Sequence, residues 1–459
     1  MPSRPLAVCH TDPSPVPEEP AWAVLVAALP EGEAALERSA RAYGAVRRRR
    51  EVQSASDLLR LALAYAVAGW SLRFTAAWAE VVGLALLSEA ALRRRFRQAQ
   101  PWLAHLVATL VLEARHTERL PQAHVRLIDA SVICAPGATG TPWRIHLSAT
   151  VAPIPRIDGV ERTDYHGGET LRRHTFAADE IAVADRGDCH PRALQTLDAQ
   201  GTHFVVRYAW QMLPLHTATG RPVDLDVWLP TIVPSGTAEQ AVRLATDAPT
   251  AARRLRLVAV ALPEEVANQA RARLRREARR KGRTPQARSL LVAGYVVVLT
   301  NLPADRWDAA AVLALYRVRW QVELVFKRLK GLWHLGALRA RTPGAAQAVL
   351  LSGLLAALLA ERVAHPLGVP RVDGFAAVER PVSLWRWTAL WHQVVHQALT
   401  GTLPLTTVTA VLPLLQRHLC DTPRRRRQQA ALARQSLQVR TPLPVQLPLF
   451  RLSDLAHAA

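Results

Sequence analysis

Cysteine is scarce in this chain of 459 residues, and the few that occur lie far apart. A zinc cluster needs closely spaced ligands, and a disulfide framework is typical of much shorter chains. No two of the cysteines form a Cys-x-x-Cys pair, so we expect neither kind of protein. The four are Cys9, Cys134, Cys189 and Cys420.

Long hydrophobic runs are also missing. The longest reaches from about Ala345 to Ala360 and is twice interrupted by a polar residue, whereas a membrane-spanning helix needs ~20 apolar residues. The first residues place acids among prolines and lack the basic-then-apolar order of a signal peptide. We therefore expect a cytoplasmic protein in which this run forms a buried helix.

Acidic residues are few relative to basic ones. There are 37 acids against 58 lysines and arginines, so the formal net charge is +21. Only three of the basic residues are lysines. The coding bias of a GC-rich genome would explain arginine in place of lysine, but not the excess of cations. A globular protein this basic usually binds a polyanion, and nucleic acid is the leading candidate.

The hydrophobic half of the sequence is ample for a sizeable core, and 459 residues exceed one typical domain. Two runs of four arginines, at 47–50 and 424–427, would contact phosphate without reading sequence. The texture of the chain predicts six segments. They are a Pro-rich and basic arm (1–50), a helical domain (51–120), the first part of a sheet domain (121–208), a β-rich insertion (209–300), the second part of the sheet domain (301–365) and a helical, basic C-terminal region (366–459).

Three helices are predicted between Ser56 and about His116. Ser71 and Ser88 are suited to cap helices, because a short side-chain oxygen can accept an unpaired backbone N–H. The third helix carries a cluster of arginines, of which three share a face by their spacing. We consider two interpretations equally: a helix-turn-helix reader of the DNA major groove, and a bundle with a solvated basic face. The cluster is Arg93, Arg94, Arg95 and Arg97.

Strands follow from residue 125 onward. Apolar and polar residues alternate around Asp129 and again over Trp143–Leu147, with a turn expected near Asp158–Gly159. Ile181–Asp185 is a short apolar strand, and a helix and a further strand, His203–Arg207, come after it. This order predicts an α/β protein with a mixed sheet covered by helices.

The segment 209–300 departs from this pattern. It contains a polar helix, Glu264–Arg280, a charged link at 279–283, and a β-rich run, Leu290–Thr300. We interpret it as an insertion into the sheet domain, before the helix that carries Glu323.

That helix, expected over Asp308–Lys330, separates its polar and apolar residues. At ~100° per residue, one carboxylate, one phenol and several cations share an arc of roughly 80°. The apolar residues on the opposite side should dock on the sheet. The simpler alternative is an ordinary surface ion pair between Glu323 and Lys327. The polar set is Tyr316, Arg319, Glu323, Lys327 and Lys330, and the apolar set is Val318, Val322, Val325, Phe326 and Leu329.

Two further acids suggest a metal site. Asp129 lies inside an apolar strand and Asp185 ends another, positions where a carboxylate is costly unless it is paired or binds metal. Neighbouring strands could place the two side by side, with Glu323 closing the site from the helix. Carboxylate oxygens suit Mg²⁺ or Mn²⁺, and two such ions can drive in-line displacement at a phosphodiester.

With these residues in view, the chain resembles the DDE transposases of bacterial insertion sequences, specifically the insertion-sequence-four family. The family signature is Tyr, two residues, Arg, three residues, Glu, six residues and Lys. It is complete here as Tyr316, Arg319, Glu323 and Lys330. Asp129 and Asp185 match the two family aspartates, and the resemblance covers about residues 55–365.

The resemblance implies a ribonuclease-H-like core with a β-rich insertion before the last catalytic helix, flanked by helical N- and C-terminal regions. It also implies an enzyme that binds terminal inverted repeats and performs Mg²⁺- or Mn²⁺-dependent DNA cleavage and strand transfer, through a hairpin intermediate. Asp129, Asp185 and Glu323 would hold two ions. The partners would be element-end and target DNA, bound by a paired-end dimer in the bacterial nucleoid.

Other residues of the family pattern would hold DNA. Tyr316, Arg319 and Lys330 would contact the terminal phosphate beside a flipped base, and Lys327 lies on the same face. Arg93 and Arg97 would contact DNA from the N-terminal domain. Tyr295 or Trp307 could take the vacated stacking place, although a core aromatic is the favoured interpretation of both.

One position departs from the family pattern. Asp188 stands where an aromatic residue is common, and its carboxylate could lie behind the metal ligands, be solvated, or disturb the metal geometry. Two alternative functions remain at this point: another ribonuclease-H-like metal nuclease, which would not need the Tyr–Arg–Lys face, and a non-catalytic DNA-binding protein or inactive remnant. An intact set of three carboxylates argues against the last.

Overall fold

The structure is a computed structural model of the chain. It describes residues 21–30, 32–47, 51–117, 125–134, 143–150, 156–234, 236–246, 255–336, 338, 340, 342–364 and 383–401. Both predicted arginine runs, apart from Arg47, and the cysteines Cys9 and Cys420 lie outside these residues.

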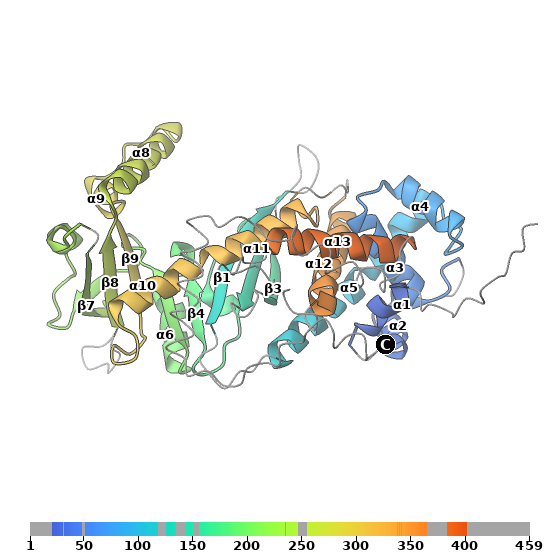
Figure 1. Cartoon of the computed structure of the whole chain (residues 1–459), viewed down its shortest axis with the longest axis horizontal. Coiled ribbons are helices and arrows are strands. Elements are labelled where there is room, and N and C mark those ends of the chain that lie inside the picture. Colours follow the sequence, from blue (N-terminus) through green and yellow to red (C-terminus); the bar gives the residue numbers. More distant parts are fainter. Residues whose placement is uncertain are drawn as a thin grey trace, which may run out of the picture.

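Nine described strands form one mixed sheet, in the order β3-β2-β1-β4-β5-β9-β8-β7-β6. Strands β1, β4 and β5 are parallel, and all other neighbours are antiparallel. The sheet is long because β6 to β9 extend it beyond β5 (Figure 1). The strands are β1 Val125–Ile133, β2 Trp143–Thr150, β3 Arg156–Asp164, β4 Ile181–Ala184, β5 His203–Arg207, β6 Leu215–Thr217, β7 Thr237–Leu244, β8 Leu255–Ala261 and β9 Tyr295–Thr300.

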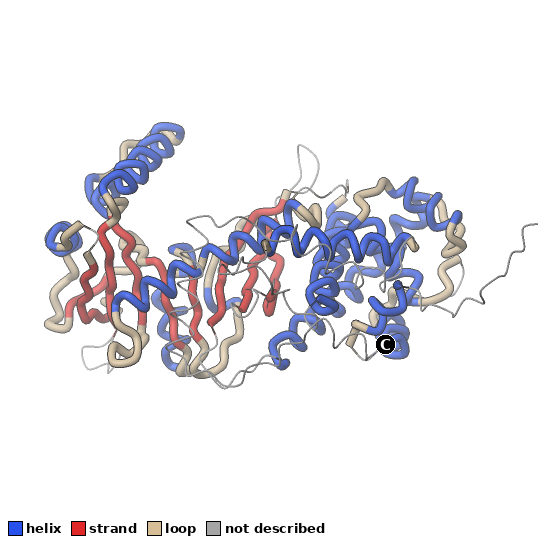
Figure 2. The backbone as a smooth tube through the Cα atoms, in the orientation of Figure 1, coloured by secondary structure: helices blue, strands red, loops and turns tan. Residues whose placement is uncertain are grey.

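Helices gather into a separate body at one end of the sheet and also cross its faces (Figure 2). The helices before the sheet are α1 Ala21–Ala27, α2 Gly32–Ala42, α3 Ala55–Val67, α4 Leu72–Val81 and α5 Glu89–Thr117. Those between and after the strands are η1 Leu171–Arg173, η2 Arg186–Asp188, α6 Pro191–Ala199, α7 Leu225–Trp228, η3 Leu229–Thr231, α8 Glu264–Arg280, α9 Ala287–Val292, α10 Ala309–Val318, α11 Trp320–Gly331, α12 Pro343–Ala364 and α13 Leu384–Thr400.

Alternation along the strands divides the buried residues into two cores, because successive side chains point to opposite faces. Leu127 and Val183 pack with α10, α11 and the helical body on one face. Ile128 and Ala182 pack on the other face, where α6 contributes Leu194. This mixed α/β architecture confirms the predicted fold class and is consistent with a ribonuclease-H-like core.

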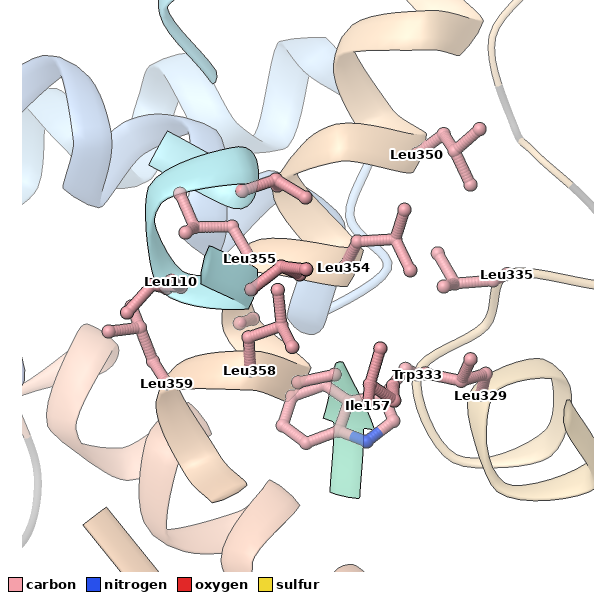
Figure 3. Close-up of a cluster of buried hydrophobic side chains, with 14 of the residues drawn as sticks. Leu110, Ile157, Leu329, Trp333, Leu335, Leu350, Leu354, Leu355, Leu358 and Leu359 are labelled. Atoms are coloured by element: carbon pink, nitrogen blue, oxygen red, sulfur yellow. The ribbon is translucent and has the colours of Figure 1, made fainter. Parts of the chain in front are cut away.

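Helix α12 joins the sheet to the helical body. Its leucines meet Leu110 of α5, Ile157 of β3 and Trp333 after α11 (Figure 3). Among the described helices only α12 is long and apolar enough to cross a membrane, yet 72% of its most apolar window is buried inside the protein. The prediction of a buried helix for this run is confirmed.

Helices α4 and α5 begin at the predicted capping serines. Ser71 Oγ accepts the backbone N–H of Phe74 at 3.1 Å, and Ser88 Oγ accepts that of Ala91 at 3.2 Å. Gly69 adopts a φ of 64° between α3 and α4, a left-handed conformation that favours glycine. The third predicted helix corresponds to α5, which is 29 residues long and contains Pro101.

Two sequence predictions in the sheet region are wrong. The expected turn at Asp158–Gly159 lies inside β3, where Asp158 is buried in an ion pair with Arg126 at 2.7 Å. Gly159 is needed there, because a Cβ would come within 2.3 Å of Ser148 Oγ. The expected single helix around Glu323 is two helices, α10 and α11, separated by Arg319.

Candidate active site

Two aspartates lie side by side at one edge of the sheet. Strands β1 and β4 are parallel and pair Leu127 with Val183, so two residues further on Asp129 is level with Asp185. Leu127 and Val183 belong to the core on the face of α10 and α11, and period-2 alternation points both aspartates to that face. The predicted juxtaposition is therefore present.

Arg319 lies among the three predicted carboxylates. Its Nη2 bonds Glu323 Oε1 at 2.5 Å and its Nη1 is 3.9 Å from Asp129 Oδ2. Arg319 also lowers the pKa of Asp185 electrostatically. Since the Glu323 side chain is 55% exposed while that of Arg319 is 15% exposed, Glu323 faces solvent and the guanidinium lies beneath it.

The environments of the two aspartates shift their pKa values in opposite directions. Burial raises the pKa of Asp129 to about 6, although Arg319 opposes the shift. Burial also acts to raise the pKa of Asp185, but Arg319, the Arg186 backbone N–H and Arg207 outweigh it and hold the pKa below the usual value. Asp185 is thus firmly ionised, whereas a nearby cation would stabilise the ionised form of Asp129.

Tyr316 ends α10 with its ring buried and its hydroxyl directed at the site. The hydroxyl donates to Asp185 Oδ1 at 3.1 Å. Burial, together with the charge of Asp185, raises the pKa of Tyr316 to about 12, so the phenol stays protonated and donates. The sequence predicted a shared polar face, but Tyr316 does not share the solvent exposure of Glu323.

The two lysines of α11 contact different parts of the protein. Lys330 Nζ donates to Ser131 Oγ at 2.7 Å and to the Val132 carbonyl at 2.8 Å, which ties α11 to β1 just beyond Asp129. Lys327 is exposed, and its ammonium lies 5.8 Å from the ring centre of Trp385 in α13.

Asp188 is buried behind the site, with 3% of its surface exposed. Burial raises its pKa to about 8, and Glu169, Asp129 and Asp185 add to the shift. The solvated reading of Asp188 is therefore wrong. The Glu169 side chain packs directly against Gly187, next to Asp188 in the chain. A Cβ on Gly187 would come within 1.8 Å of Glu169 Oε2.

The apolar side of the helix pair docks as predicted. All five expected residues are buried, and α11 contacts β1. The ordinary surface ion pair between Glu323 and Lys327 is absent from the described contacts, because Glu323 bonds Arg319 instead. The five are Val318, Val322, Val325, Phe326 and Leu329.

Other predicted residues lie elsewhere. Arg93 and Arg97 are exposed on α5, where Arg93 bonds Glu89. Trp307 is buried, in agreement with a core aromatic, whereas Tyr295 is half-buried at the start of β9.

Arg207 at the end of β5 is a site residue that the sequence reading missed. The parallel register pairs Val183 with Val205, so Arg207 is level with Asp185 and acts on its pKa. Its position as the last residue of a strand next to β4 was the available signal.

Two comparisons with known proteins bear on this site. The sequence matches the family described as the transposase DDE domain over residues 160–359, a range that contains Asp185 and Glu323 and starts after Asp129. It is also 40% identical over 353 residues to a protein of Escherichia coli strain K12 named as the InsL transposase of insertion sequence element IS186A, covering 75% of this chain and 94% of that protein. The chain belongs to the DDE transposases of insertion sequences.

A further relative, the transposase for insertion sequence element IS421 of Escherichia coli, is 40% identical over 354 residues with the same coverage. The transposase is therefore an enzyme of DNA transposition, and DDE domains of this kind use divalent metal ions. Its excess of cations agrees with a DNA partner.

The two aspartates and Glu323 of the transposase suit such ions, because their carboxylate oxygens are hard ligands. The charges of Asp185 and Glu323 also raise the pKa of Asp129. Among the described residues, no three His, Cys, Asp or Glu side chains converge on one metal position. The Arg319 side chain instead bonds Glu323 and lies 3.9 Å from Asp129 Oδ2.

Proposed function

We propose that the transposase binds the terminal inverted repeats of its element and cuts and joins DNA at Asp129, Asp185 and Glu323. The observation that carries this proposal is the level placement of Asp129 and Asp185 on adjacent parallel strands, facing a docked helix that presents Glu323. Such a cluster of carboxylates is suited to phosphodiester chemistry.

The three carboxylates would hold two Mg²⁺ or Mn²⁺ ions, which activate a water or 3′-hydroxyl and stabilise the leaving oxygen when bound. Arg319 balances the negative charge in their place. On this proposal Glu323, which is exposed, exchanges its bond with Arg319 for the ions, and Arg319 is then available to a DNA phosphate.

Tyr316, Arg319, Lys327 and Lys330 would position the terminal phosphate. Tyr316 Oη and the Arg319 guanidinium both act on Asp185, so a phosphate bound there would lie next to a catalytic carboxylate. Their spacing supports placement in the insertion-sequence-four family, with its hairpin intermediate and paired-end dimer, as part of the same proposal.

The helical domain at 51–120 would contact the element end through Arg93 and Arg97, which are exposed. Residues 209–300 would be an insertion between the two parts of the ribonuclease-H-like core. The transposase would act in the bacterial cytoplasm, on nucleoid DNA.

The test is cleavage of a duplex carrying the terminal inverted repeat, with Mg²⁺ or Mn²⁺. Glu323→Gln should reduce nicking by at least about 1,000-fold, because the amide cannot provide an anionic ligand, while the Kd for DNA changes less than about threefold. Glu323→Asp keeps a carboxylate at this position and should restore part of the nicking activity. A carboxylate placed at Gln321 would not replace it, because Gln321 is buried on another side of α11.

Persistent nicking by Glu323→Gln would remove this residue from the site. Absence of any metal-dependent nicking by the wild-type protein, with DNA binding intact, would favour the inactive-remnant alternative.

A further inference from the structure

Helix α8 is a basic arm that projects from the sheet. It leaves the end of β8 and returns through α9 to β9, and both helices extend away from the sheet (Figure 1). Only Ala267, in its first turn, is buried among its 17 residues. Arg271 ties it to α9 by donating to the Leu290 carbonyl at 3.2 Å. We call α8 and α9 the basic arm.

Positive charge on the arm is concentrated from Arg271 onward. Residues 271–283 contain eight cations and a single acid, Glu277, which bonds Lys281. At ~100° per residue, five arginines occupy an arc of ~160° on the side opposite Ala267 and Leu274. All five are exposed, and none makes an ion pair within the described part of the chain. They are Arg273, Arg275, Arg276, Arg279 and Arg280.

This arrangement has an electrostatic cost in the free protein. Arg275 and Arg279 are four residues apart, as are Arg276 and Arg280, and like charges at this spacing destabilise a helix. An anionic partner along the exposed face would remove the repulsion. A row of fixed cations of this length suits the closely spaced phosphates of a duplex.

The sheet register places the arm at the same edge as the carboxylates. Asp185 follows the end of β4, and Arg207 ends the parallel strand β5. Strand β9 is antiparallel to β5 and pairs Val298 with Arg207, so its first residue, Tyr295, lies at this edge. Tyr295 pairs with Ala261, the last residue of β8. The arm therefore leaves the sheet where the catalytic strands end.

The dimensions allow one duplex to reach both places. Strands β4 and β9 are separated by two strand spacings, roughly 10 Å. The 17 residues of α8 span ~25 Å, the length of about 7 base pairs.

We infer that the basic arm binds the phosphate backbone of the DNA duplex that is being processed at Asp129 and Asp185. The inference rests on the proposed function for the location of the cut. The contact is made to phosphates and does not read sequence. The duplex on the arm is either the element side or the flanking side of the cleavage position, which share the same backbone chemistry.

The test uses a variant with Arg275→Ala, Arg276→Ala, Arg279→Ala and Arg280→Ala. Alanine keeps the helix, since it has the highest helix propensity. Binding is measured at several salt concentrations, with a 40-base-pair duplex that has the terminal repeat in its centre. The Kd should rise at least about tenfold near 0.15 M salt, and the slope of log affinity against log salt should fall in size by up to ~3.6.

The matched control changes the same four positions to lysine. It keeps the charge and should retain the wild-type salt slope and a Kd within about threefold, because a phosphate row needs charge more than the guanidinium shape. Duplexes extended on only the element side or only the flanking side then show which side the arm holds. A loss of affinity on either one supports the inference.

An unchanged Kd and salt slope in the folded alanine variant, on all three duplexes, would overturn the inference and leave a solvated basic face. This result is distinct from failure of the proposed function. In that case the wild-type protein itself would not nick the repeat-containing duplex, whatever the arm does.

Discussion

At the scale of single residues, the site is defined by how charges compensate one another. Arg319 balances Asp129, Asp185 and Glu323, while the pKa of Asp188 is raised by burial and by neighbouring acids more than Arg173 lowers it. Desolvation disfavours a charged carboxylate, so Asp188 is protonated over much of the neutral range. It can therefore lie behind the ligand carboxylates without adding a full negative charge.

Asp188→Asn should make stability less dependent on pH. The folded pKa of Asp188, about 8, is above the usual value near 3.8. Its stabilising contribution is therefore present below pH ~4 and is lost as the pH rises through 8. Relative to wild type, the variant should gain about 2–4 kcal/mol in unfolding free energy between pH 5 and pH 8. Urea unfolding with EDTA measures this.

Glu169→Gln is a useful companion, because the charge of Glu169 raises the pKa of Asp188 more than that of Asp129 or Asp185 does. It should shift the pH dependence downward without abolishing it. If the difference between Asp188→Asn and wild type is the same at pH 5 and pH 8, Asp188 does not titrate as described.

At the scale of elements, the helix pair α10 and α11 packs over the part of the sheet that carries Asp129 and Asp185, which we call the carboxylate edge. Its apolar residues fix it to the sheet, and Arg319 separates the two helices while keeping a helical backbone, with φ −48° and ψ −38°. Lys330 adds a polar tie to Ser131 and Val132 of β1. The position of Glu323 therefore depends on contacts on both sides of it along α11.

Lys330→Met should slow end cleavage more than it weakens DNA binding. The ammonium is occupied by two hydrogen bonds to β1, and their loss should lower the free energy of unfolding by about 1–2 kcal/mol. Single-turnover nicking and the Kd for the repeat-containing duplex are compared. Arg317→Met is the matched control, because Arg317 is an exposed cation on α10 of the same helix pair and has no place in the proposed site.

An equal loss in rate and affinity for Lys330→Met, with unchanged stability, would make Lys330 a generic phosphate contact that neither ties α11 to β1 nor positions the terminal phosphate. Ser131→Ala should reproduce part of the stability loss, since it removes one of the two acceptors.

At the scale of the whole molecule, three groups of cations in the described part of the chain are candidates for DNA contact. Arg319 and Arg207 are within the carboxylate edge, the basic arm projects from the same edge, and Arg93 and Arg97 are on α5 in the helical body (Figure 1). DNA held at more than one of these places would be positioned by phosphate contacts before any cut. The salt dependence of binding should therefore exceed that of any one place alone.

Replacing both Arg93 and Arg97 with alanine should raise the Kd for the repeat-containing duplex about tenfold, if α5 contacts the element end. The effect on an unrelated duplex should be smaller when the contacts read bases, and equal when they touch phosphate only. Fluorescence anisotropy on both duplexes measures the difference.

The control variant is Arg221→Ala with Arg243→Ala, two arginines in the sheet region rather than in the helical body. A Kd for the Arg93/Arg97 variant that is no higher than that of this control would identify the face of α5 as a solvated face of the bundle.

The sequence alone determined that this protein is a DDE transposase with a mixed α/β fold. Period-2 and period-3.6 patterns predicted the strands around Asp129 and Asp185 and the apolar side of α11. They could do so because the spacing of apolar residues along the chain shows which side of a strand or helix is buried. The resemblance to the DDE transposases of insertion sequences is confirmed, and the narrower placement by the spacing of Tyr316, Arg319, Glu323 and Lys330 stays a prediction.

Only the tertiary structure decided which groups meet. Arg319 bonding Glu323, the burial of Asp188 and the level position of Arg207 depend on strand register and helix docking. The place of the basic arm depends on β9 running antiparallel to β5, a pairing between segments about 90 residues apart. Such long-range pairings leave no periodic trace in the sequence, because each strand's own pattern is the same whichever neighbour it takes. The carboxylate edge is thus visible in the sequence as three residues, and in the fold as a charge-compensated site with a cationic arm beside it.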